Sequence, residues 1–129
     1  MQEQINSDPR AEATIAAIRR FHDAFNGRDA DAVMAAMTDD CVAELPYPPP
    51  DGLRFEGSAA VRTAWETFFA SSPAATFELE EIAAWEDRAV VRWLYRWTDA
   101  DGQAGHVRGV DVMRVRDGKV AESLGYVKG

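Results

Sequence analysis

The sequence has little of several features on which protein functions commonly depend. Cys41 is the only cysteine, so no disulfide can form within the chain. Lys and Arg number 14 against 22 Asp and Glu, and the resulting formal charge of −8 disfavours nucleic acid as a partner. No stretch approaches the roughly 20 apolar residues of a membrane-spanning helix. The first residues also lack the pattern of a signal peptide, so we expect a cytoplasmic protein that does not bind membranes.

The chain is also poor in residues that ligate metals. His22 and His106 are the only two histidines, and together with Cys41 they show none of the spacings of a metal site. We therefore predict neither a metal nor a cofactor. His22 follows Phe21 on the first helix and could act as a base, although its solvent-facing neighbours favour a position at the rim. His106 is expected in an exposed position near a hairpin, and Cys41 is expected to fill space in the core.

Helical periodicity dominates the first part of the chain. With 129 residues, 47% of them apolar, residues 1–129 are expected to form a single domain with its own core. Three helices are predicted, each behind a capping side chain. They span residues 9–26 behind Asp8, 30–37 behind Asp29 and 59–72 behind Ser58.

Strand patterns follow the second and third helices. Residues 41–45 predict a short strand that ends at the proline-rich loop 46–52. After Pro73 the pattern becomes alternating, with short turns between the strands. The predicted strands span residues 76–84, 88–98, 106–116 and 119–127. This order predicts an α+β fold in which three N-terminal helices pack on one face of a curved, mostly antiparallel sheet.

Three segments resemble a known superfamily. They are Phe25-Asn26-Gly27-Arg28-Asp29, Phe55-Glu56-Gly57, and the run from Gly109 to Val115 that continues into Asp117-Gly118-Lys119-Val120. Together with the order of elements they are similar to the nuclear transport factor 2-like superfamily, and in particular to SnoaL-like domains, which include ketosteroid isomerase-like and polyketide cyclase-like relatives. The resemblance implies a cone-shaped α+β barrel whose pocket holds a small, largely apolar molecule.

The catalytic residues that the resemblance implies are incomplete here. Ketosteroid isomerase-like members carry an aspartate before a proline, a tyrosine on the first helix and a protonated aspartic acid on a later strand. This chain has Leu45, Phe21 and Asp111 at those positions. Cyclase-like and epoxide hydrolase-like members use an acid on the last strand, where this chain has Gly125. The hydrolases' Arg-x-Asp pair is represented only by Arg92.

Asp111 is therefore the candidate catalytic residue. It stands between Val110 and Val112, where an ionised carboxylate is costly unless it is paired or protonated. One interpretation is a proton donor that faces the pocket. The other is a structural ion pair with an arginine on a neighbouring strand, for which the candidates are Arg92, Arg96 and Arg114.

The predicted pocket lining is aromatic and apolar. Trp93 is assigned to the interior because of its size, although a register shift of one residue would bring Arg92 inside instead. Tyr47, in the proline-rich loop, is predicted to control access to the pocket. Glu78, Glu80 and Glu81 are predicted to form a solvated face. The predicted substrate-binding residues are Phe21, Phe25, Leu45, Tyr47, Trp65, Trp93 and Met113.

Two functions remain open at this point. One is a non-catalytic domain that binds a small, largely apolar ligand. The other is a cofactor-independent acid/base enzyme, an isomerase, cyclase or dehydratase, that uses Asp111 on a polyketide-like or terpenoid-like substrate. In either case a homodimer is expected through the outer face of the sheet, whose apolar residues are Val90, Leu94, Val110 and Val112.

Overall fold

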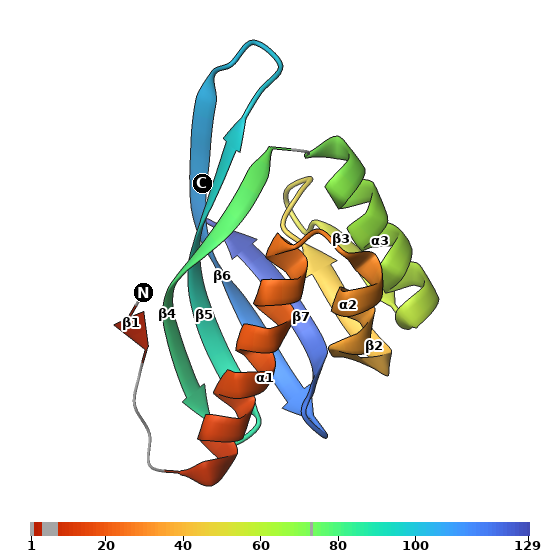
Figure 1. Cartoon of the computed structure of the whole chain (residues 1–129), viewed down its shortest axis with the longest axis vertical. Coiled ribbons are helices and arrows are strands. Elements are labelled where there is room, and N and C mark those ends of the chain that lie inside the picture. The colour runs from red at the N-terminus through yellow and green to blue at the C-terminus, as the bar shows by residue number, and fades with distance from the viewer. Residues whose placement is uncertain (1, 4–7, 73) are drawn as a thin grey trace.

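Three helices lie along one side of a long, curved sheet in the computed structural model, which describes residues 2–3, 8–72 and 74–129 (Figure 1). The helices are α1 (Pro9–Asn26), α2 (Ala30–Ala35) and α3 (Ser58–Ser71). The strands are β1 (Gln2–Glu3), β2 (Met37–Leu45), β3 (Leu53–Glu56), β4 (Ala75–Trp85), β5 (Arg88–Thr98), β6 (Ala104–Arg116) and β7 (Lys119–Val127). The predicted α+β class with three helices on a mostly antiparallel sheet is confirmed.

The sheet has seven strands in the order β1-β4-β5-β6-β7-β2-β3. Strands β4 to β7 form the predicted antiparallel meander. Strand β2 adds to β7 in parallel, and β3 then pairs antiparallel with β2. The parallel β2–β7 pair brings the N-terminal half of the chain against the last strand, so residues from both halves can meet on the concave side.

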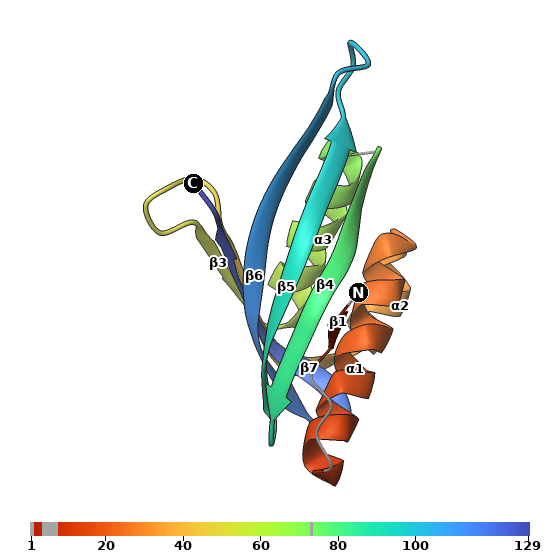
Figure 2. The same cartoon turned by 90° about the vertical axis from the view of Figure 1, so that its left-hand side faces the viewer.

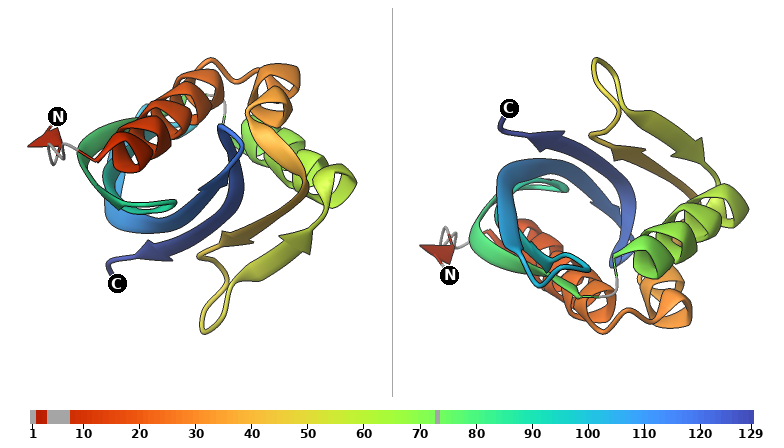
Figure 3. Two further views of the ribbon diagram at one scale, coloured as in Figure 1. Left: turned by 90° about the horizontal axis from the view of Figure 1, so that it is seen from below. Right: turned by 90° about the horizontal axis from the view of Figure 1, so that it is seen from above.

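The sheet curls around the helices. Viewed along the long axis, the strands form an arch, and α1 lies across its open side with α2 and α3 beside it (Figure 3). The β5–β6 hairpin projects beyond the other elements (Figure 1 and Figure 2). The space between helices and sheet is filled mainly by buried apolar side chains, among them Ile18, Met37, Ile82 and Met113.

Helix α1 begins and ends as its sequence predicts. The Asp8 carboxylate accepts a hydrogen bond from the Arg10 backbone N–H, and Pro9 takes the first helical position, where its missing N–H is not needed. The helix ends at Asn26, before the Gly27 cap. Its buried face includes Ile18, Phe21 and Phe25, as the helical periodicity indicates.

The main differences from the prediction concern Met37, the cap of α3 and strand β3. Strand β6 also begins two residues earlier than predicted, at Ala104, and β4 extends one residue further at each end. Met37 belongs to β2, not to the second helix, because its backbone pairs with Val120 of β7 and this pairing overrides the helical pattern. Gly57, at φ 88°, is the N-cap of α3, and its N–H bonds to the Cys41 carbonyl at 2.8 Å, so Ser58 is not the cap. Strand β3 lies between the predicted loop and the predicted third helix, where no element was expected.

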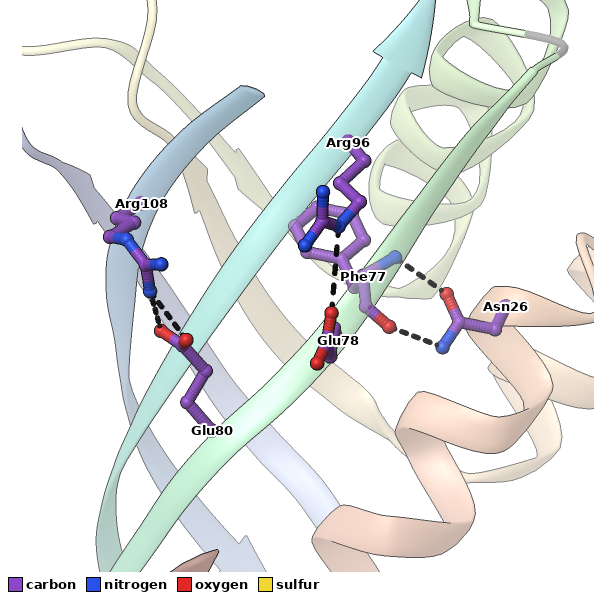
Figure 4. Close-up of polar contacts among 6 residues, drawn as sticks. All are labelled: Asn26, Phe77, Glu78, Glu80, Arg96 and Arg108. Atoms are coloured by element: carbon purple, nitrogen blue, oxygen red, sulfur yellow. Dashed lines mark hydrogen bonds and ion pairs between the residues drawn. The ribbon is translucent and has the colours of Figure 1, made fainter. Parts of the chain in front are cut away.

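The turn between α1 and α2 holds the start of β4 in place. The Asn26 side-chain amide accepts from the Phe77 N–H at 2.9 Å and donates to the Phe77 carbonyl at 2.8 Å (Figure 4). The Arg28 guanidinium donates to the backbone carbonyls of Ala75, Phe69 and Ser72. These contacts explain why an asparagine and an arginine flank the glycine in this turn.

The outer face of the sheet carries cross-strand ion pairs. The three glutamates that were predicted to form a solvated face each pair with an arginine, and two of these pairs are drawn in Figure 4. The pairs are Glu78–Arg96 at 3.5 Å, Glu81–Arg92 at 3.3 Å, and Glu80–Arg108. Trp93 and its arginine neighbours therefore face opposite sides of β5, and the predicted register is correct.

Among the described helices, none is both long and apolar enough to cross a membrane.

Candidate functional site

A cavity of about 210 Å³ opens between the helices and the concave side of the sheet. Helices α1 and α3 supply one wall, and strands β2, β5, β6 and β7 supply much of the other. The polar or charged residues at the cavity are His22, Asp111, Ser123 and Glu44. The remaining lining residues are Phe21, Phe25, Leu45, Pro46, Tyr47, Trp65, Phe68, Phe77, Trp93, Tyr95, Val107, Gly125 and Val127.

Aromatic rings in mutual contact form most of the wall. Phe25 packs edge-on against Trp65 with ring centroids 5.1 Å apart, and against Phe77 at 5.5 Å. Phe77 in turn contacts Trp93 at 5.1 Å with an interplanar angle of 85°. Edge-to-face packing of this kind fixes ring orientations beyond what burial alone achieves, so the cavity has a defined shape.

Two glycines leave room for the groups that line the cavity. A Cβ at Gly109 would lie 2.5 Å from the Trp93 ring, so the indole can lie against the bare backbone of β6. A Cβ at Gly125 would lie 3.3 Å from the Asp111 carboxyl. Gly125 was noted for lacking an acid, and it is the direct cross-strand partner of Asp111. The glycine therefore makes space for a carboxyl from the neighbouring strand.

Asp111 points into the cavity from the middle of β6, and its side chain is 14% exposed. Burial raises the pKa of this carboxyl from 3.8 to about 7 because desolvation penalises the charged form. The indole N–H of Trp93 partly offsets the rise in pKa, although it lies outside normal hydrogen-bond geometry. The carboxyl is consequently protonated for a large fraction of the time near neutral pH.

The alternative of a structural ion pair between Asp111 and an arginine is wrong. The candidate arginines Arg92, Arg96 and Arg114 lie on the outer face and pair with Glu81, Glu78 and Glu122 respectively. Asp111 faces the opposite side of the sheet, because neighbouring residues of a strand alternate between its faces.

His22 was expected at the rim of its helix, and this expectation is wrong. The residue is 4% exposed and lines the cavity, with its Nε2 atom 4.0 Å from the Asp111 Oδ2 atom. Burial lowers the pKa of the imidazole to about 4, so His22 is neutral at pH 7. The signal was present in the sequence, because positions 18, 21, 22 and 25 form one helical stripe.

The predicted substrate-binding residues separate into two groups. Six of them line the cavity, whereas Met113 does not and lies instead in the core at 1% exposure. Tyr47 is 55% exposed and lines both the cavity and a second, more open groove of about 810 Å³ that continues to Trp97. Sequence reasoning missed the contributions of Phe68, Phe77 and Tyr95.

Two further residues of interest lie away from the site. Cys41 is fully buried in the core, and burial raises the pKa of its thiol, as expected for a residue that fills space. His106 is exposed on β6. Within the described part of the chain, no group of three or more His, Cys, Asp or Glu side chains could hold a metal ion.

Comparison with known proteins agrees with this architecture. An NTF2-like protein of unknown function from Mesorhizobium loti is 40% identical over 100% of both chains, with a TM-score of 0.79. A putative SnoaL-like polyketide cyclase from Jannaschia sp. CCS1 is 18% identical with a TM-score of 0.80, over 97% of this chain and 92% of that chain. A putative ketosteroid isomerase from Kribbella flavida DSM 17836 is 23% identical with a TM-score of 0.74, over 92% and 80% of the two chains.

The last two likenesses show the fold alone, because both identities are low. No curated protein matches the chain. The family model of the SnoaL-like domain matches residues 18–123, which is most of the chain. Because this match covers most of the chain, the chain belongs to the SnoaL-like domain family.

Proposed function

We propose that this protein binds a small, largely apolar molecule in the cavity between α1 and the sheet. The observation that carries the proposal is an aromatic-lined cavity of about 210 Å³ with a buried carboxyl at its wall. This volume exceeds the roughly 150 Å³ of a cavity that binds benzene. It falls short of the roughly 300 Å³ at which drug-sized pockets begin. A ligand of one or two rings fits these limits.

Thermal stability in the presence of ligands tests the proposal. A panel of one- and two-ring compounds should contain members that raise the melting temperature, because a ligand at about 100 times its dissociation constant stabilises by roughly 2.7 kcal/mol. Leu45→Trp would fill the cavity from β2 and should abolish the effect. Its cross-strand partner Leu53 is 47% exposed, so Leu53→Trp is the matched control. If no compound stabilises the wild type, the proposal fails.

A second candidate function is acid/base catalysis without a cofactor. The proximity of Asp111 to a neutral histidine favours it, because a carboxyl with a pKa of about 7 can both give and take a proton near neutral pH. The substrate would be polyketide-like or terpenoid-like, and the reaction an isomerisation, cyclisation or dehydration. Asp111 would be the catalytic residue and His22 would contact the same substrate.

We also propose that two copies associate through the outer face of the sheet. Of the apolar residues expected on this face, Val90, Val110 and Val112 are only partly buried, whereas Leu94 is buried at 3% exposure and offers no surface to a partner. Tyr126, paired with Val110, is 55% exposed. Light scattering at micromolar concentration should give about twice the chain mass of 14.3 kDa. Val112→Glu should give a monomer, since it places a charge in the contact. A wild-type mass of one chain would contradict this proposal.

A further inference from the structure

The cavity continues into a wider groove for which the proposed function has no use. The groove has a volume of about 810 Å³ and shares the lining residues Tyr47, Tyr95 and Val107 with the cavity. It runs along the end of β5, in the hairpin that projects beyond the other elements (Figure 1 and Figure 2). Because the two spaces share these residues, one ligand can occupy both.

Three aromatic side chains of β5 lead from the cavity into the groove. Trp93, Tyr95 and Trp97 are two residues apart in sequence, so they lie on the same face of the strand. Trp93 lines the cavity, Tyr95 lines both spaces, and Trp97 lines the groove. The ring centroids of Tyr95 and Trp97 are 5.7 Å apart, with an interplanar angle of 33°. These two rings therefore form a nearly continuous aromatic surface along the groove.

A glycine on β6 fixes the position of the outer indole ring. Gly105 is the cross-strand partner of Trp97, and a Cβ at this position would lie 2.5 Å from atoms of the indole ring. The indole therefore rests on bare β6 backbone, as the indole of Trp93 rests on Gly109. Trp97 is nevertheless 37% exposed, which leaves part of a well-placed aromatic ring open to the groove.

We propose that the groove is a second binding subsite, in which an aromatic ring of the ligand lies against Tyr95 and Trp97. The inference rests on the proposed binding function and extends its ligand class. The inner ring system of the ligand occupies the cavity, and a short linker carries a second aromatic ring into the groove. Tyr95 contacts both parts of the ligand.

The volumes of the two spaces favour a ligand with two separate parts. The cavity of about 210 Å³ takes one or two rings and is too small for a drug-sized molecule, whereas the groove of about 810 Å³ lies within the range of drug-sized pockets. A strand rises about 3.3 Å per residue, so Trp93 and Trp97 are roughly 13 Å apart along β5, with Tyr95 midway. A linker of a few carbon atoms past Tyr95 connects the two parts.

The aromatic surface of the groove favours an aromatic ring over other apolar groups. Any apolar group gains free energy when it covers the exposed part of Trp97, in proportion to the area that it buries. Two aromatic rings in contact gain more than their buried area accounts for. A saturated ring of the same size gains only the contribution from burial, so the two kinds of ring can be distinguished by experiment.

Equilibrium dialysis with three matched compounds tests the inference. Naphthalene serves as the inner ring system alone, 2-(3-phenylpropyl)naphthalene adds an aromatic ring, and 2-(3-cyclohexylpropyl)naphthalene adds a saturated ring. The wild type should bind the phenylpropyl compound about tenfold more tightly than naphthalene. Trp97→Ala should remove most of this difference, and it should weaken binding of the cyclohexylpropyl compound less. Trp85, on β4, is 48% exposed and lies outside both spaces, so Trp85→Ala is the matched control and should leave the difference unchanged.

The outcomes separate the inference from the proposed binding function. If none of the three compounds binds the wild type, the proposed binding function fails and the inference fails with it. If naphthalene binds and the phenylpropyl compound binds no more tightly, the cavity function stands and the second subsite is refuted. An equal advantage of the phenylpropyl compound in Trp97→Ala and the wild type also refutes it. Equal losses for the two ring types in Trp97→Ala refute the preference for an aromatic ring.

A second variant tests the subsite without removing Trp97. Ala74 is exposed and lines the groove but not the cavity. Ala74→Trp should fill part of the groove and reduce the advantage of the phenylpropyl compound over naphthalene, even if Trp97→Ala does not fold. An unchanged advantage in Ala74→Trp would place the second ring outside the groove and overturn the inference.

Discussion

The two buried titratable groups of the cavity make opposite contributions to stability as pH changes. Burial raises the pKa of Asp111 from 3.8 to about 7 and lowers the pKa of His22 from 6.5 to about 4. Between about pH 4 and pH 6.5, the folded pair holds one proton on Asp111, whereas the unfolded pair holds one proton on His22. Since both states bind the same number of protons, the pair adds almost no pH dependence to the free energy of unfolding in this window.

Single substitutions should separate the two contributions to the free energy of unfolding, which cancel in the wild type. One pKa unit corresponds to about 1.4 kcal/mol, so ionising Asp111 in the folded protein costs about 4 kcal/mol and protonating His22 about 3 kcal/mol. The Asp111 pKa is raised on folding, so the contribution of Asp111 to the free energy of unfolding is fully present below pH 4 and is lost as pH rises to 7. The His22 pKa is lowered on folding, so burial of His22 reduces the free energy of unfolding at pH 4, and this penalty disappears as pH rises to 6.5.

Asp111→Asn should therefore become more stable relative to wild type by about 4 kcal/mol between pH 4 and pH 8. His22→Phe should show the opposite trend and become less stable relative to wild type by about 3 kcal/mol between pH 4 and pH 6.5. Urea denaturation followed by tryptophan fluorescence measures both differences. Comparison at equal pH removes the contributions of all other groups.

The double variant Asp111→Asn/His22→Phe is the internal control. It lacks both groups, so its profile between pH 4 and pH 6.5 should again run parallel to that of the wild type. Glu44, the other charged residue at the cavity, pairs with Arg54 at 2.8 Å, and none of these substitutions changes either residue of that pair. If the two single variants run parallel to the wild type across the whole pH range, neither group is desolvated on folding, and the burial of Asp111 and His22 at the cavity is wrong.

Three further predictions follow from the site and its supports. With any substrate that the protein turns over, Asp111→Asn should keep binding the substrate but lower kcat by the 10²–10⁴-fold typical of lost general acid catalysis. An unchanged kcat would contradict a catalytic role for Asp111. Asn26→Ala should lower the free energy of unfolding by about 1–3 kcal/mol, because it leaves the Phe77 backbone groups unpaired, and urea denaturation measures the loss. Gly109→Ala should destabilise by about 1–3 kcal/mol through overpacking, since its Cβ would lie 2.3 Å from the Tyr126 carbonyl oxygen; an unchanged midpoint would contradict this.

Elements with local signals were predictable from the sequence. Asp8 and Pro9 mark the start of α1, and short turns separate the strands of the meander, so the boundaries of these elements agree with the structure to within two residues. Strand β2 depends on pairing with β7, more than 70 positions away in the chain. No local pattern reports such a partner, and for this reason Met37 was assigned to a helix.

The candidate site was predicted in part, for a related reason. Asp111 and Trp93 were placed by the two-residue period of strands, which leaves only two choices of face. His22 was considered as a base and then set aside because a histidine among charged neighbours resembles a surface residue, although its helical position lies on the buried stripe. The role of His22 depends on its distance from Asp111 on β6. The spacing of residues within one helix does not give the distance to a residue on another element.

The turn that follows α1 has a consequence for how the protein can assemble. On the side away from β5, strand β4 pairs only with the two-residue strand β1, and exposed strand edges are templates for pairing with other chains. Here side chains and a short strand occupy that edge in succession: Arg28 at the Ala75 carbonyl, Asn26 at Phe77, and β1 at Glu81 and Ile82. A second chain therefore finds few unpaired backbone groups on β4. Loss of Asn26 would expose two of them and create a starting point for aggregation, while association through the broad outer face would remain open.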